Sequence, residues 1–539
     1  MRRCRRAVRC LLFLAILTSA IGKAPVVSAV DGNRLTYAYS GDVGHLNPHL
    51  YGTPFVFQNM VYEPLLKSGE NGRIVPWLAE SWTESEDGKE YRFRLREGVR
   101  FSDGTPFDAH AVKKNFDAVL MNRDMYRWLE LINQIGETEV VDELTFRMVL
   151  KEYYYPALQE LCLFRPLVFV SPAVFPESGN TAEGIKKPVG TGPWVLAEYK
   201  RDEYAVFRRN DDYWRKKPAI GEIRVKIIPD PESRALALES GEVDLIFGGG
   251  YVGGAVSMDT FMSLRRTGRY GSAISPPMAV RTIAMNTGRG PTVDPAVRRA
   301  IQHAVNKQSI AKGVFFDTEK PADTLFARTA LYCDIDLPAY EFSIGKSSAI
   351  LDEAGWKLKP GGKSREKNRE QLALDLSFVG TNPIHKALAE VIQGDLARVG
   401  IKVRLMGEEP QTFSNRWKTG EFHLTILETW GAPYDPHSLV SSMRFPTHAD
   451  YQAQLGLPMK KEIDEKISRL LVMRDDKERR ILYDCVLRTL HEQSVYIPIT
   501  FLASMVIHGK RVKGVHFGPT MYEIPFEDME LDETVAEKR

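Results

Sequence analysis

The chain has few cysteines, and their arrangement favours neither a disulfide framework nor a thiolate metal site. Of the five cysteines in 539 residues, Cys4 and Cys10 lie near the N-terminus, which leaves Cys162, Cys333 and Cys485, an odd number. No CxxC pair occurs, and zinc sites and redox motifs need such pairs. We therefore expect the three later cysteines to be apolar core residues.

The sequence also lacks a charge excess and the common catalytic motifs. Its 72 Lys and Arg nearly balance 70 Asp and Glu, which argues against nucleic acid as a partner. There is no GxSxG and no HExxH, and Cys162 has no assigned base. The GKS at 362–364 is a poor phosphate-loop match, because the upstream glycine position holds Lys357. We therefore predict that the protein is not an enzyme.

A single long apolar run is present, and it lies at the N-terminus. Residues 1–10 are basic, 11–22 are apolar, and Val27-Ser28-Ala29 offers small residues for cleavage. This pattern predicts a secretory signal peptide over 1–29. A membrane anchor is the alternative, but the run falls short of the roughly 20 residues that span a bilayer. We expect an exported protein with no membrane span.

Periodicity in the rest of the chain predicts alternating strands and helices, typical of a mixed α/β protein of more than one domain. Asp108 is placed to cap one of these helices, and Gly400 to end another. Strands are predicted at 34–39, 91–95, 145–150, 167–171, 401–406 and 496–501, and helices at 56–66, 109–120, 297–305, 384–399, 463–471 and 481–490.

The stretch from Thr429 to Asp450 is unusually rich in residue types that bind ligands. It carries Trp, Tyr, Arg and two His among Gly, Ser and three Pro. Proline and glycine prevent a long helix or strand here. We expect an ordered loop with very short elements, held on a rigid scaffold, which is where binding residues concentrate.

Several segments together resemble the solute-binding proteins of ABC importers, in the peptide/nickel-binding group. The group is indicated by the run at 79–119, by GTGPWVL at 190–196 and by VRRAIQHAVNKQSI at 297–310. Its nickel-binding members are indicated by LNPHLY (46–51), WLELINQI (128–135), YYPALQELCLFRP (154–166), KPADTLFA (320–327) and the stretch 429–454. The resemblance covers essentially the whole chain after the signal peptide.

This resemblance implies a two-lobed α/β periplasmic binding protein fold (type II, cluster C) with a ligand cleft and a hinge. The first lobe would comprise 30–275 plus 500–539, with an extra subdomain at about 70–190. The second would comprise 276–499, and the hinge would lie near 270–280 and 495–505. The implied function is that of a monomeric periplasmic receptor that captures nickel(II) as a small-molecule chelate and delivers it to the permease subunits of an ABC importer.

Carried over position by position, the resemblance also implies a site. His448 would contact the metal, and Arg165 would bind a carboxylate of the chelator. Three pocket positions depart from the pattern and hold Val56, Met125 and Ser414; Arg127 is expected to substitute near Met125. The aromatic lining would consist of Tyr51, Trp128, Trp430 and Tyr434.

The chemistry of these residues suits a metal ion that is already bound by a small chelator. Neutral imidazole binds divalent nickel well, but one His cannot fill its coordination sphere, so free histidine or a polycarboxylate would supply the remaining ligands. Arg pairs with a carboxylate through two parallel hydrogen bonds. His49 and His437 are alternative ligands, for which turn hydrogen bonds are the simpler interpretation. Judged without the resemblance, His448 is more simply interpreted as a solvated surface residue and Arg165 as a surface ion-pair residue. Trp128 and Trp430 are then more simply interpreted as core residues.

Other functions stay open at this point. An oligopeptide or dipeptide receptor of the same fold would need an acidic group facing the peptide amine. A haem or ferric-chelate carrier would use the same aromatic walls. A secreted hydrolase has no motif in its favour.

Overall fold

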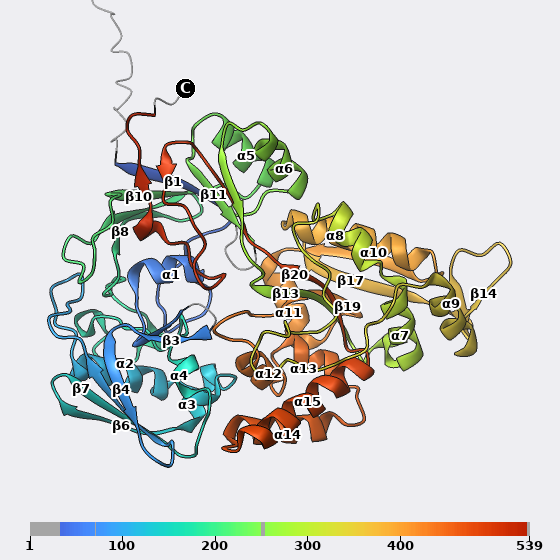
Figure 1. Cartoon of the computed structure of the whole chain (residues 1–539), viewed down its shortest axis with the longest axis horizontal. Coiled ribbons are helices and arrows are strands. Elements are labelled where there is room, and N and C mark those ends of the chain that lie inside the picture. Colours follow the sequence, from blue (N-terminus) through green and yellow to red (C-terminus); the bar gives the residue numbers. More distant parts are fainter. Residues whose placement is uncertain (1–32, 70–71, 250–253, 536–539) are drawn as a thin grey trace, which may run out of the picture.

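The computed structural model describes residues 33–69, 72–249 and 254–535. The predicted signal peptide, 1–29, lies outside the described residues. The ribbon forms two lobes built on separate sheets, joined by two chain crossings near the centre (Figure 1). In the part of the chain that is described, no helix has the length and apolar character to cross a membrane.

The first lobe contains a seven-stranded mixed sheet. Near its centre, β1 pairs in parallel with β10 and β11. Leu35 and Tyr37 of β1 are fully buried, as the alternating pattern predicts. In spatial order the strands are β12 (Gly271–Ile274), β21 (Met505–His508), β11 (Leu245–Gly248), β1 (Arg34–Tyr39), β10 (Glu222–Ile227), β9 (Tyr204–Arg209) and β8 (Trp194–Lys200). Helices α1 (Phe55–Val61), α5 (Pro231–Glu239) and α6 (Met258–Arg266) belong to this lobe.

The second lobe contains a five-stranded mixed sheet and most of the long helices. Helix α10 connects the parallel strands β17 and β18, which is the predicted βα unit. In order the strands are β18 (Lys402–Glu408), β17 (Ala373–Val379), β19 (Leu424–Glu428), β13 (Ala279–Met285) and β20 (Tyr496–Leu502). Its helices include α7 (Pro295–Ala304), α8 (Lys307–Gly313), α9 (Ile344–Glu353), α10 (Pro383–Ala397), α11 (Pro410–Thr419), α14 (Lys460–Val472) and α15 (Asp476–Glu492).

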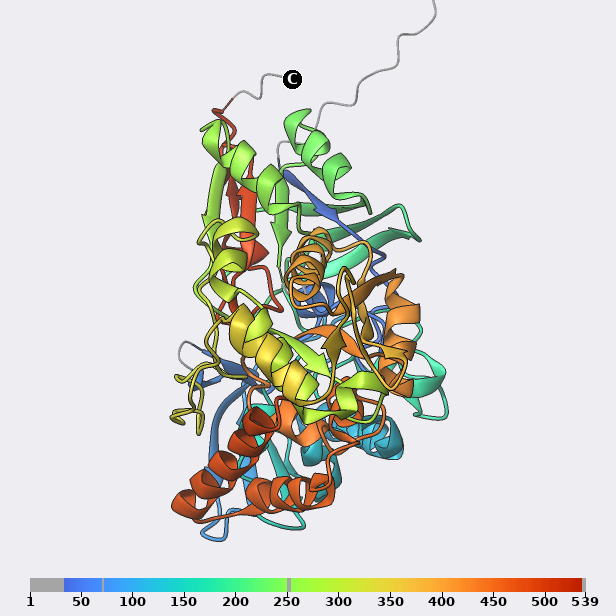
Figure 2. The ribbon, with the colours of Figure 1, turned by 90° about the vertical axis from the view of Figure 1, so that its right-hand side faces the viewer.

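A smaller antiparallel sheet lies in the segment after α1. Its order is β4 (Ala79–Glu84), β5 (Glu90–Leu95), β7 (Thr145–Leu150) and β6 (Ile135–Asp142). Helix α2 (Ala109–Met121) packs on it, and the Asp108 side chain caps that helix by accepting from the Ala111 amide at 2.8 Å. Figures 1 and 2 place α14 and α15 at this end of the molecule, far from α5 and α6.

Two predicted elements are wrong in extent or type. The helix predicted over 56–66 ends at Val61, because Pro64 cannot donate to a continuing helix and disfavours helical geometry at Glu63. The strand predicted at 167–171 is reduced to one bridge between Pro64 and Val168. The remaining predicted strands and helices are confirmed within a few residues.

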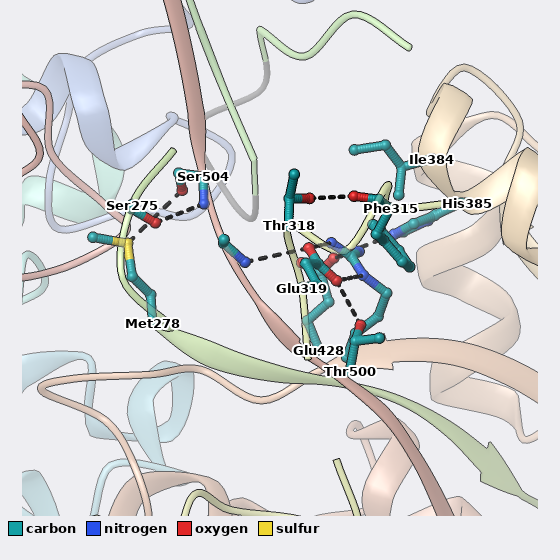
Figure 3. Close-up of polar contacts among 12 residues, drawn as sticks. Ser275, Met278, Phe315, Thr318, Glu319, Ile384, His385, Glu428, Thr500 and Ser504 are labelled. Atoms are coloured by element: carbon teal, nitrogen blue, oxygen red, sulfur yellow. Dashed lines mark hydrogen bonds and ion pairs between the residues drawn. The ribbon is translucent and has the colours of Figure 1, made fainter. Parts of the chain in front are cut away.

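The two crossings between the lobes run side by side. One is residues 275–278, between β12 and β13, and the other is 503–504, between β20 and β21. The Ser275 amide donates to the Ser504 carbonyl at 2.9 Å, and the Ser504 amide donates to Ser275 Oγ at 2.8 Å (Figure 3). The crossings lie within the intervals expected for a hinge, and rotation about them, like the domain boundaries, stays a prediction.

A buried charged network anchors the second crossing to the second sheet. Glu319 accepts from Thr500 Oγ1 at 2.5 Å (Figure 3). It also accepts from Arg281 at 3.1 Å and from the Ala503 amide at 3.2 Å. Arg281 also pairs with Glu428. These contacts hold the end of β20 in place, and the second crossing follows directly at residue 503.

Candidate functional site

An unpaired guanidinium lies against aromatic rings of the first lobe. Arg165 follows the short helix α4 (Ala157–Glu160). Its Cζ atom is 4.2 Å from the ring centroid of Phe55 and 4.7 Å from that of Tyr51. Among the described residues its buried Nε has no hydrogen-bond partner, and no carboxylate lies within ion-pair distance. A cation that is stacked but not neutralised is well suited to an anionic ligand.

His448 lies across from this group, on the second lobe. It directly precedes α13 (Ala449–Gln454), and its side chain does not cap that helix. Its ring is 5.8 Å from Trp430 and 6.2 Å from Trp128, centroid to centroid. Burial lowers the pKa of His448 to about 4, with a smaller contribution from Lys418. The imidazole is therefore neutral at physiological pH, which is the form that binds metals.

Aromatic side chains connect Arg165 to His448 and bring the two lobes together. Trp128 and Trp430 meet edge to face at 5.4 Å, although one belongs to each lobe. Trp128 Nε1 donates to Tyr51 Oη, and Tyr51 stacks with Arg165. Tyr434 packs on Trp430 at 5.8 Å, and its buried hydroxyl has no partner among the described residues. Four predicted wall residues thus form one continuous cluster.

Two further aromatic residues belong to this cluster and were missed from the sequence. Phe55 supplies the closer ring under Arg165. Tyr522, near the C-terminus, packs on Phe55 at 5.0 Å and on Tyr434 at 5.2 Å, and its hydroxyl donates to the Trp430 carbonyl at 2.5 Å. Phe55 follows Tyr51 closely enough to have been suspected, whereas no local signal indicates Tyr522.

Arg127 is not brought to this cluster. Its guanidinium pairs with Asp124 at 2.6 Å, and 65% of its side chain is exposed. Met125, which stands at a pocket position that differs from the family pattern, is 37% exposed, and its carbonyl accepts from Tyr51 Oη at 3.3 Å. In this arrangement Arg127 faces solvent.

The alternative histidines lie elsewhere. His49 Nδ1 bonds to Thr181 Oγ1 at 2.9 Å in the interior of the first lobe. His437, in α12 (His437–Ser442), is buried beside Tyr155, and burial lowers its pKa to about 3. Over the described ranges, no group of three or more His, Cys, Asp or Glu side chains is placed to hold a metal ion. A metal at His448 would therefore need most of its ligands from elsewhere.

The carboxyl groups near the cluster are engaged by the protein itself. Asp435 accepts from the amides of Trp430 at 3.1 Å and Gly431 at 2.7 Å. Glu160 accepts from Tyr154 Oη at 2.6 Å and from the Leu131 amide at 2.9 Å, and burial raises its pKa to about 8. Neither offers a free carboxylate for the amino group of a peptide.

Comparison with known proteins gives consistent matches over most of the chain. The family model for bacterial extracellular solute-binding proteins, family 5, matches residues 73–451. The nickel-binding periplasmic protein of Escherichia coli K12 is 44% identical over 505 residues, which is 94% of this chain and 96% of that one. The dipeptide-binding protein of the same strain is 27% identical over 92% of this chain and 94% of its own length.

A solved structure matches as well. NikA from Brucella suis, in complex with Fe(III)-EDTA, is 48% identical and superposes with a TM-score of 0.88, over 93% of this chain and 100% of the other. The two-lobed fold described above is therefore shared with a solute-binding protein whose ligand was a chelated metal.

Proposed function

Because the chain belongs to the family 5 bacterial extracellular solute-binding proteins, we propose that it is a periplasmic receptor that captures nickel(II) as a small-molecule chelate and delivers it to an ABC importer. It is a transport receptor and not an enzyme. Nickel is its cargo, so the metal needs to be held firmly but reversibly.

One observation carries this proposal: a neutral imidazole and an unpaired guanidinium belong to the same aromatic cluster, on opposite lobes. His448 offers one nitrogen donor to the metal. Arg165 offers parallel N–H donors to a carboxylate of the chelator. The cargo is then recognised by both its metal and its organic part, and only a ligand that carries both makes both contacts.

The chelator is inferred from what the residues lack. Since one imidazole occupies a single coordination position, the chelator must fill most of the others and still present a carboxylate to Arg165. Free histidine and small polycarboxylates meet both requirements. The indoles of Trp128 and Trp430 would cover the complex and exclude water, which strengthens the charged contacts within.

Capture and release would follow from the arrangement in two lobes. A ligand that contacts His448 and Arg165 together stabilises the state in which the lobes meet, and so shifts the population toward it. Rotation about the crossings at 275–278 and 503–504 would open the site. Permease subunits would bind the closed form and receive the chelate on opening, with no ligand exchange at the metal required beyond loss of His448.

Titration calorimetry tests the proposal with four ligands: nickel(II) alone, L-histidine alone, nickel–histidine and a dipeptide. We expect nickel–histidine to bind well and the other three to bind weakly or not at all. His448→Ala and Arg165→Gln should each weaken binding by about tenfold to a hundredfold, as expected for loss of a charge-assisted or metal contact. Arg127→Gln, at the exposed position, is the matched control.

Two results would refute the nickel assignment. Tight dipeptide binding that survives His448→Ala would make the protein a peptide receptor of the same fold. A Soret band on mixing with haem, with no heat from nickel–histidine, would make it a haem carrier.

A further inference from the structure

An arginine beside the site links the second lobe to the segment that carries Trp128. Arg444 lies just after α12, and its Nη2 donates to Glu130 Oε2 at 2.8 Å and to Ser441 Oγ at 2.9 Å. Ser441 Oγ in turn donates to the Trp128 carbonyl at 3.2 Å. Two adjacent polar links therefore cross from one lobe to the other.

Each side of this contact is held by its own lobe. Arg444 Nη1 donates to Ser468 Oγ of α14 at 2.9 Å, so the guanidinium is oriented without Glu130. Glu130 begins α3 (Glu130–Gln134), and its other carboxylate oxygen accepts from Gln134 Nε2 at 2.9 Å. Little side-chain entropy remains to be lost when the two groups meet, which favours a net contribution from the pair.

The exposure of the pair suits a contact that forms and breaks. The side chains of Arg444 and Glu130 are 15% and 13% exposed. A fully exposed ion pair contributes little to stability. Breaking a pair that is buried inside one lobe, in contrast, leaves both charges without a partner and without solvent, at a high cost in free energy. The network around Arg281 is of the second kind, with exposures of 1% and 3% for Arg281 and Glu319, and it lies entirely within the second lobe.

We propose that Arg444, Glu130 and Ser441 form a closure clasp, which stabilises the meeting of the two lobes and positions Trp128 over the site without touching the ligand. The inference rests on the proposed function for its ligand-binding consequence. Trp128 is two residues from Glu130 and packs on both Trp430 and His448. Loss of the clasp should therefore accelerate ligand dissociation more than it slows association.

The test uses the full mature chain with Arg444→Gln, Glu130→Gln and the double variant. Arg416→Gln is the control, because Arg416 pairs with Glu408 at 2.8 Å within the second lobe, at exposures of 21% and 11%. Dissociation of nickel–L-histidine is followed by tryptophan fluorescence after a chase with excess chelator. Thermal unfolding of each variant verifies that it is folded.

The distance between the lobes is measured separately, with and without nickel–L-histidine. Spin labels are attached at Glu137→Cys on β6 and Lys461→Cys on α14, whose side chains are 63% and 90% exposed. The half-buried Cys485 is replaced by serine in every protein. This measurement reports closure whether or not nickel is the cargo.

We expect each single clasp variant to raise the dissociation rate by about threefold to thirtyfold and to widen the distance distribution, with association changed by less than about twofold. The double variant should release the chelate no faster than the faster of the two single variants, because the two residues act as one unit. Unchanged dissociation and distances, or equal effects in Arg416→Gln, would overturn the clasp. Distances that respond to the clasp variants while no nickel chelate binds would support the clasp and reject the proposed cargo.

Discussion

Acidification reports directly on the environment of His448. Burial lowers its pKa from the ordinary value of 6.5 to about 4, so the unfolded chain takes up a proton at this residue between pH 6.5 and 4 while the folded chain does not. Above pH 6.5 this difference costs the folded state nothing. As the pH falls from 6.5 toward 4, the unfolded state is stabilised by protonation and the free energy of unfolding decreases. At pH 5 the two pKa values give a loss of about 2 kcal/mol, and partial exposure of the ring reduces this to roughly 1–2 kcal/mol.

Urea unfolding at pH 7.5 and pH 5.0 measures that loss. The free energy of unfolding should fall with acidification by roughly 1–2 kcal/mol less in His448→Gln than in the unchanged protein. His49 and His437 are present in both proteins, so their contributions cancel. His110→Gln, at an exposed position on α2, should keep the pH dependence of the unchanged protein.

Ligand binding provides a second measure of the same property. At pH 5.5 an imidazole of pKa 4 is about 97% neutral, whereas one of pKa 6.5 is only about 9% neutral. Affinity, expressed per intact nickel chelate present, should therefore hardly change between pH 7.5 and 5.5, instead of falling about tenfold. An NMR titration that places the His448 pKa near 6.5, or identical acid sensitivity of His448→Gln and the unchanged protein, would refute the reasoning.

Three other perturbations have clear expected outcomes. Arg165→Gln should lower the free energy of unfolding by no more than about 1 kcal/mol, since it removes the stacking on Phe55 and Tyr51 but leaves no hydrogen bond of Arg165 Nε unmade among the described residues. A loss above about 2 kcal/mol in urea unfolding would show a structural role. Glu63→Gln should cost roughly 2–4 kcal/mol by the same assay, because this buried carboxylate accepts four hydrogen bonds from Trp, Thr and Tyr side chains; a loss below 1 kcal/mol would contradict this. Gly431→Ala should lower the melting temperature and weaken chelate binding, since Gly431 has φ +63° and an added Cβ would lie 2.5 Å from the Met278 carbonyl oxygen of the first crossing. An unchanged melting temperature together with an unchanged calorimetric affinity for the chelate would contradict this strain.

The local elements were readable from the sequence because their signals are local. The Asp108 cap and the glycine after α10 fixed helix ends to within a few residues. The error at 56–66 arose because apolar periodicity continued past the point where Pro64 ends the helix. The run at 167–171 is apolar because it is buried in the core, and it finds only one bridging partner.

The site could be named only in part. Composition pointed to the stretch from Thr429 to Asp450, but not to its contacts. His448 and Arg165 came from the resemblance, because nothing local shows that residues nearly three hundred positions apart share one cluster. Tyr522 was missed for the same reason. Arg127 was expected from its proximity in sequence to Met125, but its side chain points to solvent and pairs with Asp124.

The order of strands in the first sheet governs when this protein can finish folding. Strand β21 lies between β12 and β11, although it is the last of the seven to be synthesised. Until residues 505–508 emerge, those two neighbours present open edges that can pair with other chains. The second sheet has all its strands between residues 279 and 502, so it can assemble first, and a chain truncated shortly before residue 505 should aggregate through its unfinished half.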